Sequence, residues 1–225
     1  MITDIKKINN LLKSKILFAF DFDGVIADSV EVKTKAFYTL YKTYGDAIAR
    51  KVVEHHKDNG GMSRYEKFDY YHKFFLGTQI NQEVVDQLDS QFSELVVHKV
   101  VKSPEIKGVT RFLDKLCFNN KRCIINSATP KEELVEIVSK RRLSKYFSEI
   151  YGSPASKIDN LQSALNKYNL EPGDLVFFGD SETDLNAAEC LDIQFVGIGR
   201  GIYDLLSNSN PNGFYLQDFK EIASK

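Results

Sequence analysis

Four aspartates and one lysine stand where this sequence could carry out chemistry, each a few residues after a short apolar run. They are Asp21, Asp23, Lys157, Asp180 and Asp184. If the apolar runs are strands of one parallel sheet, these side chains gather at its carboxyl edge, where open α/β sheets bind their ligands. We therefore expect a single crevice that holds all five.

Such a crevice has an electrostatic problem, because it sets four carboxylates against one obvious cation, Lys157. A cluster of carboxylates is costly unless it is protonated or neutralised. A hard divalent cation with oxygen ligands is the natural solution, and Mg²⁺ beside a substrate phosphate is the commonest such arrangement. The residues alone therefore favour a magnesium site suited to phosphoryl chemistry.

The segments that must position these residues show two alternating sequence patterns, short apolar runs and segments of helical periodicity. The apolar runs that read as buried strands are Ile16–Phe20, Arg122–Asn126, Glu149–Tyr151, Leu175–Gly179 and Phe195–Ile198. From about residue 105 they alternate with segments of helical periodicity, which is typical of a doubly wound α/β fold. We expect a parallel, Rossmann-like sheet, an extra helix near Thr3–Lys13, and a tail of loop and a helical turn or two after Ser207.

The interval from about Ser29 to Ser103 breaks this alternation, because it holds amphipathic helical stripes and no convincing strand. We therefore predict an α/β core made of residues 1–28 and 104–225, and an inserted α-helical cap of residues 29–103. In the cap, Arg64 lies in the glycine-containing loop 60–67 and could bind the part of a substrate remote from its phosphate. The alternative is a surface arginine at a helix start.

The histidines and lysines of the cap, and the cysteines of the whole chain, allow further predictions. The adjacent His55 and His56 read as solvated helix residues, and the cap holds no obvious lysine for a Schiff base. The three cysteines form no CxxC pair, so we expect reduced, mostly buried thiols.

Composition limits the class of protein. The chain has 225 residues, with 30 Lys and Arg against 31 Asp and Glu, for a net charge of -1. This balance argues against a protein that binds nucleic acid non-specifically, which needs a basic surface. The opening residues carry no apolar run long enough for a signal peptide or a membrane span. We expect a cytoplasmic protein with no membrane partner, as a monomer or homodimer.

The four segments that follow the strands resemble, in this order, the motifs of the haloacid dehalogenase superfamily. The segments are 21–28, 126–130, 152–157 and 179–184, and the resemblance covers about residues 15–30 and 105–200. The helical insert lies where members of that superfamily carry a cap domain. The resemblance is to the branch of phosphoglycolate phosphatases and β-phosphoglucomutases.

The resemblance implies a role for each matching residue. Asp21 would be the nucleophile that forms an aspartyl-phosphate, and Asp23 the general acid and base. Ser127 and the amide of Ala128 would bind a phosphoryl oxygen, and Lys157 would hold both the phosphate and Asp21. The Mg²⁺ ligands would come from Asp21, the backbone carbonyl of Asp23, and Asp180, with support from Asp184.

Several of these residues have a purely structural alternative. Asp23 and Gly24 could form an ordinary turn. Thr129 followed by Pro130 is a good helix start, with Thr129 as the cap. Asp184 has the spacing of a helix cap with Ser181, so it could serve the helix as much as a metal.

Together, residues and resemblance predict a magnesium-dependent phosphatase that acts on a small phosphorylated metabolite, such as a sugar phosphate or a phosphoglycolate-like acid. A phosphomutase of the β-phosphoglucomutase type shares the same motifs and stays open. A non-catalytic phosphometabolite-binding protein is disfavoured because every motif residue is intact.

Overall fold

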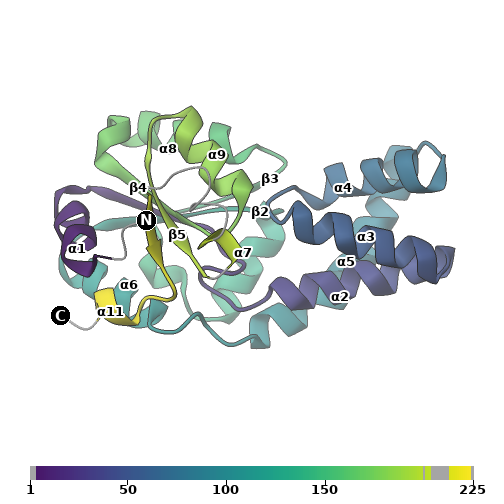
Figure 1. Ribbon diagram of the computed structural model, residues 1–225, viewed down its shortest axis with the longest axis horizontal. Helices are drawn as coiled ribbons and strands as arrows, with labels where there is room; N and C mark the ends of the chain where they lie inside the picture. Colours follow the sequence, from purple (N-terminus) through teal and green to yellow (C-terminus); the bar gives the residue numbers. More distant parts are fainter. Residues whose placement is uncertain (1–3, 200, 204–212, 224–225) are drawn as a thin grey trace.

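The computed structural model describes residues 4–199, 201–203 and 213–223. A parallel sheet forms its centre, with helices on both faces and a bundle of helices projecting beyond one end (Figure 1). The six strands are β1 (Leu17–Phe20), β2 (Arg122–Pro130), β3 (Glu149–Ser153), β4 (Leu175–Gly179), β5 (Gln194–Ile198) and β6 (Phe214–Leu216). Their order in the sheet is β3-β2-β1-β4-β5-β6. The predicted α/β fold with a parallel sheet is confirmed.

Alternate residues of β1 face opposite layers of helices. Leu17 and Ala19 pack with α8 (Lys157–Tyr168) and α9 (Glu182–Cys190). Phe18 and Phe20 pack with the other layer, made of α1 (Ile5–Ser14), α6 (Val109–Phe118), α7 (Lys131–Lys140) and α11 (Lys220–Ala223). Because every residue of β1 is buried, the strand reads as a continuous apolar run.

The strand order reverses beside β1, and this places the site. From β1 the chain moves outward to β2 and β3, then returns to the other side of β1 as β4. In doubly wound sheets the carboxyl ends of the strands at such a reversal frame the ligand crevice. The segments after β1, β2 and β4 therefore meet there.

The projecting bundle contains the helices between β1 and α6. They are α2 (Val30–Tyr41), η1 (Lys42–Tyr44), α3 (Asp46–Asp58), α4 (Arg64–Tyr71), the π-helical turn η2 (His72–Leu76) and α5 (Gln82–Lys102). Two segments connect the bundle to the sheet, and they are hydrogen-bonded to each other. The Asp28 amide donates to the Pro104 carbonyl at 2.9 Å, and the Ile106 amide donates to the Ile26 carbonyl at 3.0 Å. The two connecting segments, 26–28 and 104–106, therefore form a single narrow connection, which we call the neck.

Several sequence predictions need correction. Strand β2 runs on to Pro130, and β6 in the tail was not predicted, because three residues are too short for a periodicity signal. Cys117 and Cys190 are exposed and only Cys123 is buried, although all three thiols are free. Thr3, where the predicted first helix begins, and Ser207, where the predicted tail begins, lie outside the described residues. None of the described helices is long and apolar enough to cross a membrane.

Candidate active site

Asp21 begins the site, directly after β1. Its carboxylate is 5% exposed, accepts a hydrogen bond from the Phe22 amide at 2.7 Å, and lies 3.1 Å from the Lys157 ammonium. Burial raises the pKa of Asp21 to about 7; Lys157 lowers it, and Asp184 and Asp23 raise it. The pocket therefore holds more negative charge near Asp21 than its cations balance.

The excess charge extends to Asp180, at the end of β4. Oxygen atoms of Asp21, Asp180 and Asp184 lie within 4.8 Å of one another. Burial, followed by the charge of Asp21, raises the pKa of Asp180 well above its usual range, and no described residue forms an ion pair with it. Gly24 lets Asp180 come this close, because a Cβ on Gly24 would lie 1.9 Å from an Asp180 carboxylate oxygen. An all-oxygen set with unbalanced charge fits a hard divalent cation such as Mg²⁺.

Lys157, the first residue of α8, joins two of these carboxylates. Its ammonium lies 2.5 Å from Asp184 Oδ1 as well as near Asp21, and it is only 6% exposed. Asn126, in the middle of β2, fixes the start of this helix, because its side-chain amide donates to the Lys157 carbonyl at 3.0 Å. Burial would lower the pKa of Lys157, but Asp184 and Asp21 outweigh it and raise the pKa, so the lysine stays charged.

Asp184 caps a helix, as its spacing predicts, and it also pairs with Lys157. Its Oδ2 accepts hydrogen bonds from the Ser181 hydroxyl at 2.6 Å and the Ser181 amide at 3.2 Å, which completes a capping box at the start of α9. Its Oδ1 pairs with Lys157. Since both oxygens have partners, Asp184 supports the site mainly by holding Lys157 and the 180–184 loop.

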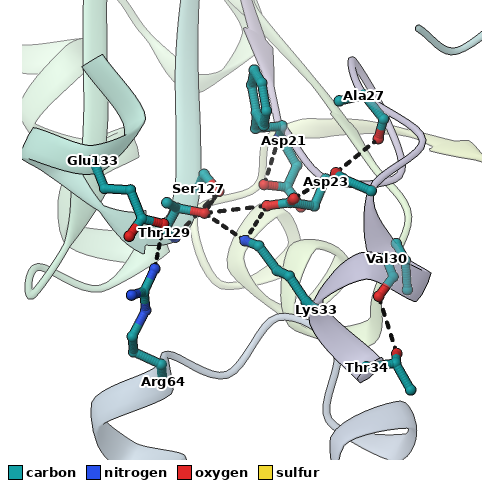
Figure 2. A network of polar contacts seen from close by, with 12 residues as sticks. Asp21, Asp23, Ala27, Val30, Lys33, Thr34, Arg64, Ser127, Thr129 and Glu133 are labelled. Carbon is teal, nitrogen blue, oxygen red and sulfur yellow. Dashed lines mark hydrogen bonds and ion pairs between the residues drawn. The ribbon is translucent and has the colours of Figure 1, made fainter. Parts of the chain in front are cut away.

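Asp23 lies beside Asp21 in a network that the sequence did not reveal (Figure 2). Lys33 of α2 donates to Asp23 Oδ2 at 2.5 Å and to the Thr129 hydroxyl at 2.7 Å, and Ser29 donates to Asp23 Oδ1 at 2.6 Å. Burial alone would raise the pKa of Asp23, but Lys33 and the hydrogen bonds lower it. Asp23 is therefore an ionised acceptor that ties the bundle to the core.

This network corrects two sequence interpretations. Thr129 is not a helix cap: α7 begins at Lys131 with Pro130 before it, and the Thr129 hydroxyl lies 3.2 Å from Asp23. Lys157 is not the single cation of the crevice, because Lys33 reaches it from the bundle. Ser127 is 2% exposed, and it lines the cavity together with Ala128.

Arg64 lines the same cavity, but its charge already has acidic partners. It is 5% exposed, so it is not a surface arginine, and its guanidinium pairs with Glu133 of α7 and with Asp89 of α5 at 3.1 Å. It also donates to Ser93 at 2.8 Å. Figure 2 shows Arg64 reaching from the bundle to the core helix that carries Glu133. Because its charge is already balanced, Arg64 links the bundle to the core and is poorly suited to determine substrate specificity.

A cavity lined by residues of both parts lies between the strand ends and the bundle. It offers about 80 Å³ of space, and its walls include Asp21, Asp23, Ser127, Lys157 and Asp180 from the core. From the bundle come Lys33, His56, Gly60, Gly61, Met62 and Lys67. Gly61 makes the closure possible, since a Cβ there would lie 2.5 Å from the Thr183 side chain.

The bundle side of the cavity contains a buried amine, Lys67, against expectation. It is 1% exposed, its Nζ lies 2.8 Å from Nδ1 of His56, and burial lowers its pKa to about 7. His56 is 5% exposed, so the prediction of a solvated residue was wrong for it. The signal available in the sequence was spacing, because Arg64 and Lys67 stand one helical turn apart.

The comparisons agree with this geometry. The family model of the haloacid dehalogenase-like hydrolases matches residues 18–198. The chain is 25% identical to a phosphoglycolate phosphatase of Photorhabdus laumondii over 96% of its length and 94% of the relative's. It is also 25% identical to a phosphoglycolate phosphatase of Aliivibrio fischeri, over 87% of this chain and 90% of the relative.

Solved structures share the fold. A β-phosphoglucomutase from Clostridium difficile superposes with a TM-score of 0.74 at 20% identity, covering 92% of this chain and 93% of that one. A predicted phosphoglycolate phosphatase from Haemophilus somnus gives a TM-score of 0.73 at 18% identity, covering 93% and 96%.

Proposed function

The chain belongs to the haloacid dehalogenase-like hydrolase family, and from that premise we propose that it is a magnesium-dependent phosphatase of small metabolites that carries the phosphoryl group on Asp21. One observation supports this most directly. The buried Asp21 carboxylate lies 3.1 Å from the Lys157 ammonium and within 4.8 Å of an oxygen of the unpaired Asp180, in a cavity that the bundle also lines. A nucleophile, a phosphate-binding cation and a place for a metal are thus assembled within one cavity.

In the first step, an Asp21 carboxylate oxygen attacks phosphorus, and the bond from phosphorus to the substrate oxygen breaks. Lys157 and Ser127 lie where they can hold phosphoryl oxygens, since both line the cavity beside Asp21. The leaving oxygen needs a proton. Because free Asp23 is ionised, it would act as a relay that passes a proton of the Lys33 ammonium, 2.5 Å away, to the leaving oxygen.

In the second step, water attacks the phosphorus of the aspartyl-phosphate and Asp21 leaves as a carboxylate. The lowered pKa of Asp23 suits it to take the proton of that water, because it keeps the carboxylate ionised. Asp21 and Asp180 would hold Mg²⁺ with the Asp23 carbonyl. The ion would neutralise the carboxylates and stabilise the charge of the phosphoryl group in the transition state.

The helices between residues 29 and 103 act in this proposal as a cap that excludes water during the first transfer. The neck at Asp28 and Pro104 would be the hinge between this cap and a core that we assign to residues 1–28 and 104–225. The same arrangement would serve a phosphomutase, in which a rotated substrate takes the phosphoryl group in place of water.

The test is release of inorganic phosphate from a panel of phosphorylated metabolites, with Mg²⁺ and with a chelator. We expect turnover that disappears on chelation and returns with Mg²⁺, without any bisphosphate activator. A requirement for a bisphosphate, with an isomeric sugar phosphate as product, would identify a mutase instead. Tight binding of the panel without any turnover would identify a binding protein.

A further inference from the structure

Every cation that lines the cavity and is buried has a carboxylate partner, with one exception. Lys33 pairs with Asp23, Arg64 with Glu133 and Asp89, and Lys157 with Asp21 and Asp184. Lys57 is exposed to water. Among the described cations that line the cavity, Lys67 alone is buried without an ion pair. A buried ammonium without a counter-ion is costly, so its presence calls for an explanation.

The surroundings of Lys67 make the lack of a counter-ion plain. Its Nζ contacts His56 at 2.8 Å and lies 5.5 Å from the centre of the Phe37 ring. His56 supplies an acceptor without charge, because burial, followed by Lys67 and Lys33, lowers its pKa to about 2. The charged groups that act on Lys67 are Lys33 of α2, Glu66 of its own helix, and Lys157 and Asp23 of the core. The two lysines repel it, and neither acid pairs with it.

We propose that Lys67, oriented by His56, is the specificity residue of this enzyme and binds a second anionic group of the substrate, a carboxylate or a further phosphate. The inference rests on the proposed function, because it places the esterified phosphate at Asp21 and Lys157. Lys67 lines the same cavity and belongs to the cap. A short substrate with an anion at each end would span the two.

Binding of such a substrate changes the charge of the amine. The pKa of free Lys67 is about 7, and an anionic group beside it raises that pKa. Near pH 8 the protein should therefore take up a proton when the substrate binds. A contact without charge recognition would not produce this uptake.

The kinetic experiment compares matched substrates on wild-type protein, Lys67→Met, Lys67→Arg and the control Lys51→Met, which changes an exposed lysine of α3. The first pair is 2-phosphoglycolate and ethyl phosphate, and the second is a sugar bisphosphate and its monophosphate. We expect wild-type kcat/KM to favour the member with the second anion. Lys67→Met should lower kcat/KM for that member by about 10- to 100-fold and leave its neutral counterpart nearly unchanged. The pair that shows the effect distinguishes a carboxylate from a phosphate.

A second readout does not depend on turnover. Calorimetry of 2-phosphoglycolate binding to Asp21→Asn protein, in buffers of different ionisation enthalpy, should show proton uptake near pH 8. The double variant Asp21→Asn with Lys67→Met should show none. Lys67→Met should also melt at a higher temperature, because it removes an uncompensated buried charge, so a loss of selectivity cannot be ascribed to a damaged fold.

Three outcomes would overturn the inference while leaving the phosphatase intact. They are equal use of both members of each pair by the wild-type protein, an equal loss on both in Lys67→Met, and borohydride trapping of Lys67 as an imine with a carbonyl substrate. No phosphate release from any substrate would count against the proposed function itself.

Discussion

At the residue scale, two unpaired charges define the cavity, one of each sign. Asp180 has no cationic partner on the core side, and Lys67 has no anionic partner on the bundle side, among the residues that the structure describes. The two are not paired with each other. The simplest account is that each is complementary to something the enzyme binds, a metal ion at Asp180 and an anion at Lys67.

The Lys67 charge has a pH-dependent cost that can be measured. Its pKa is about 7 in the folded protein and 10.5 in the unfolded chain, so the unfolded chain binds more protons between these values and stability rises with pH there. Lys67→Met should be more stable than wild type at pH 7 by on the order of 3 to 5 kcal/mol. Its advantage should shrink by roughly 1.4 kcal/mol per pH unit toward pH 9.5. Urea unfolding at several pH values measures this, and a constant or reversed difference would mean that the amine is not buried unpaired.

Asp180 allows the corresponding test of the metal. Mg²⁺ should raise the Tm of the wild-type protein, because it binds only the folded state. The expected rise is roughly 2–4 °C for each kcal/mol that binding adds to the free energy of unfolding. Asp180→Asn should melt higher than wild type without Mg²⁺ and gain little when it is added. The control Asp69→Asn, an exposed residue of α4, should respond as wild type does. An equal Mg²⁺ shift in wild type and Asp180→Asn would place the ion elsewhere.

At the scale of elements, α4 is fastened to the core by Arg64. Its guanidinium joins α4 to Glu133 of α7 and Asp89 of α5, and it lies 4.7 Å from the centre of the Phe92 ring. Removing one partner of a buried network leaves the others uncompensated, which usually costs several kcal/mol. This linkage crosses from the bundle to the core, so it bears on the position of the whole bundle.

Arg64→Met should therefore destabilise the protein by about 3 kcal/mol and lower kcat/KM by a similar factor for every substrate. Arg50→Met is the matched control, because Arg50 pairs with Asp46 on an exposed helix face and such pairs contribute little. The measurements are urea unfolding and kinetics on the substrate panel. A change in the ranking of substrates by Arg64→Met, with stability unchanged, would return Arg64 to the role that the sequence predicted.

At the scale of the whole molecule, activity depends on how closely the bundle can approach the core. The turn before α4 meets the 180–184 loop at Gly61, where an added Cβ would lie 2.5 Å from Thr183. At the adjacent Gly60 the nearest atom to an added Cβ is 3.7 Å away, in ordinary contact. The two glycines form a natural matched pair.

Gly61→Ala should hold the bundle away from the core and lower kcat at least tenfold, because water then enters the cavity and the bundle residues Lys67 and Lys33 lose their positions relative to Asp21. Gly60→Ala should cost far less. Both variants should keep the fold, as judged by circular dichroism and Tm. Equal kinetics for the two alanine variants would show that this close approach is not required for turnover.

The core of this molecule could be predicted from sequence because each motif residue is placed by its own strand. Asp21, Lys157 and Asp180 follow apolar runs that read as strands, and parallel strands end at one edge. Lys33 and Thr129 were missed because their contact joins segments far apart in the chain, and Lys67 was missed because its position on a helix does not reveal that it is buried. Lys33 meets Thr129 across 96 residues, and no periodicity encodes that meeting. The one cap residue singled out, Arg64, was chosen for its charge, and its acidic partners could not be foreseen.

The central claim is that Asp21 carries the phosphoryl group, and mass spectrometry of acid-quenched enzyme tests it most directly. Protein mixed with Mg²⁺ and a turned-over substrate is quenched within the first turnover, digested and mapped. The account predicts one added phosphoryl group on the peptide that contains Asp21, absent from Asp21→Asn, which should keep the Tm of a folded protein and lose turnover. A phosphoryl group on another residue, or full turnover by Asp21→Asn, would contradict it.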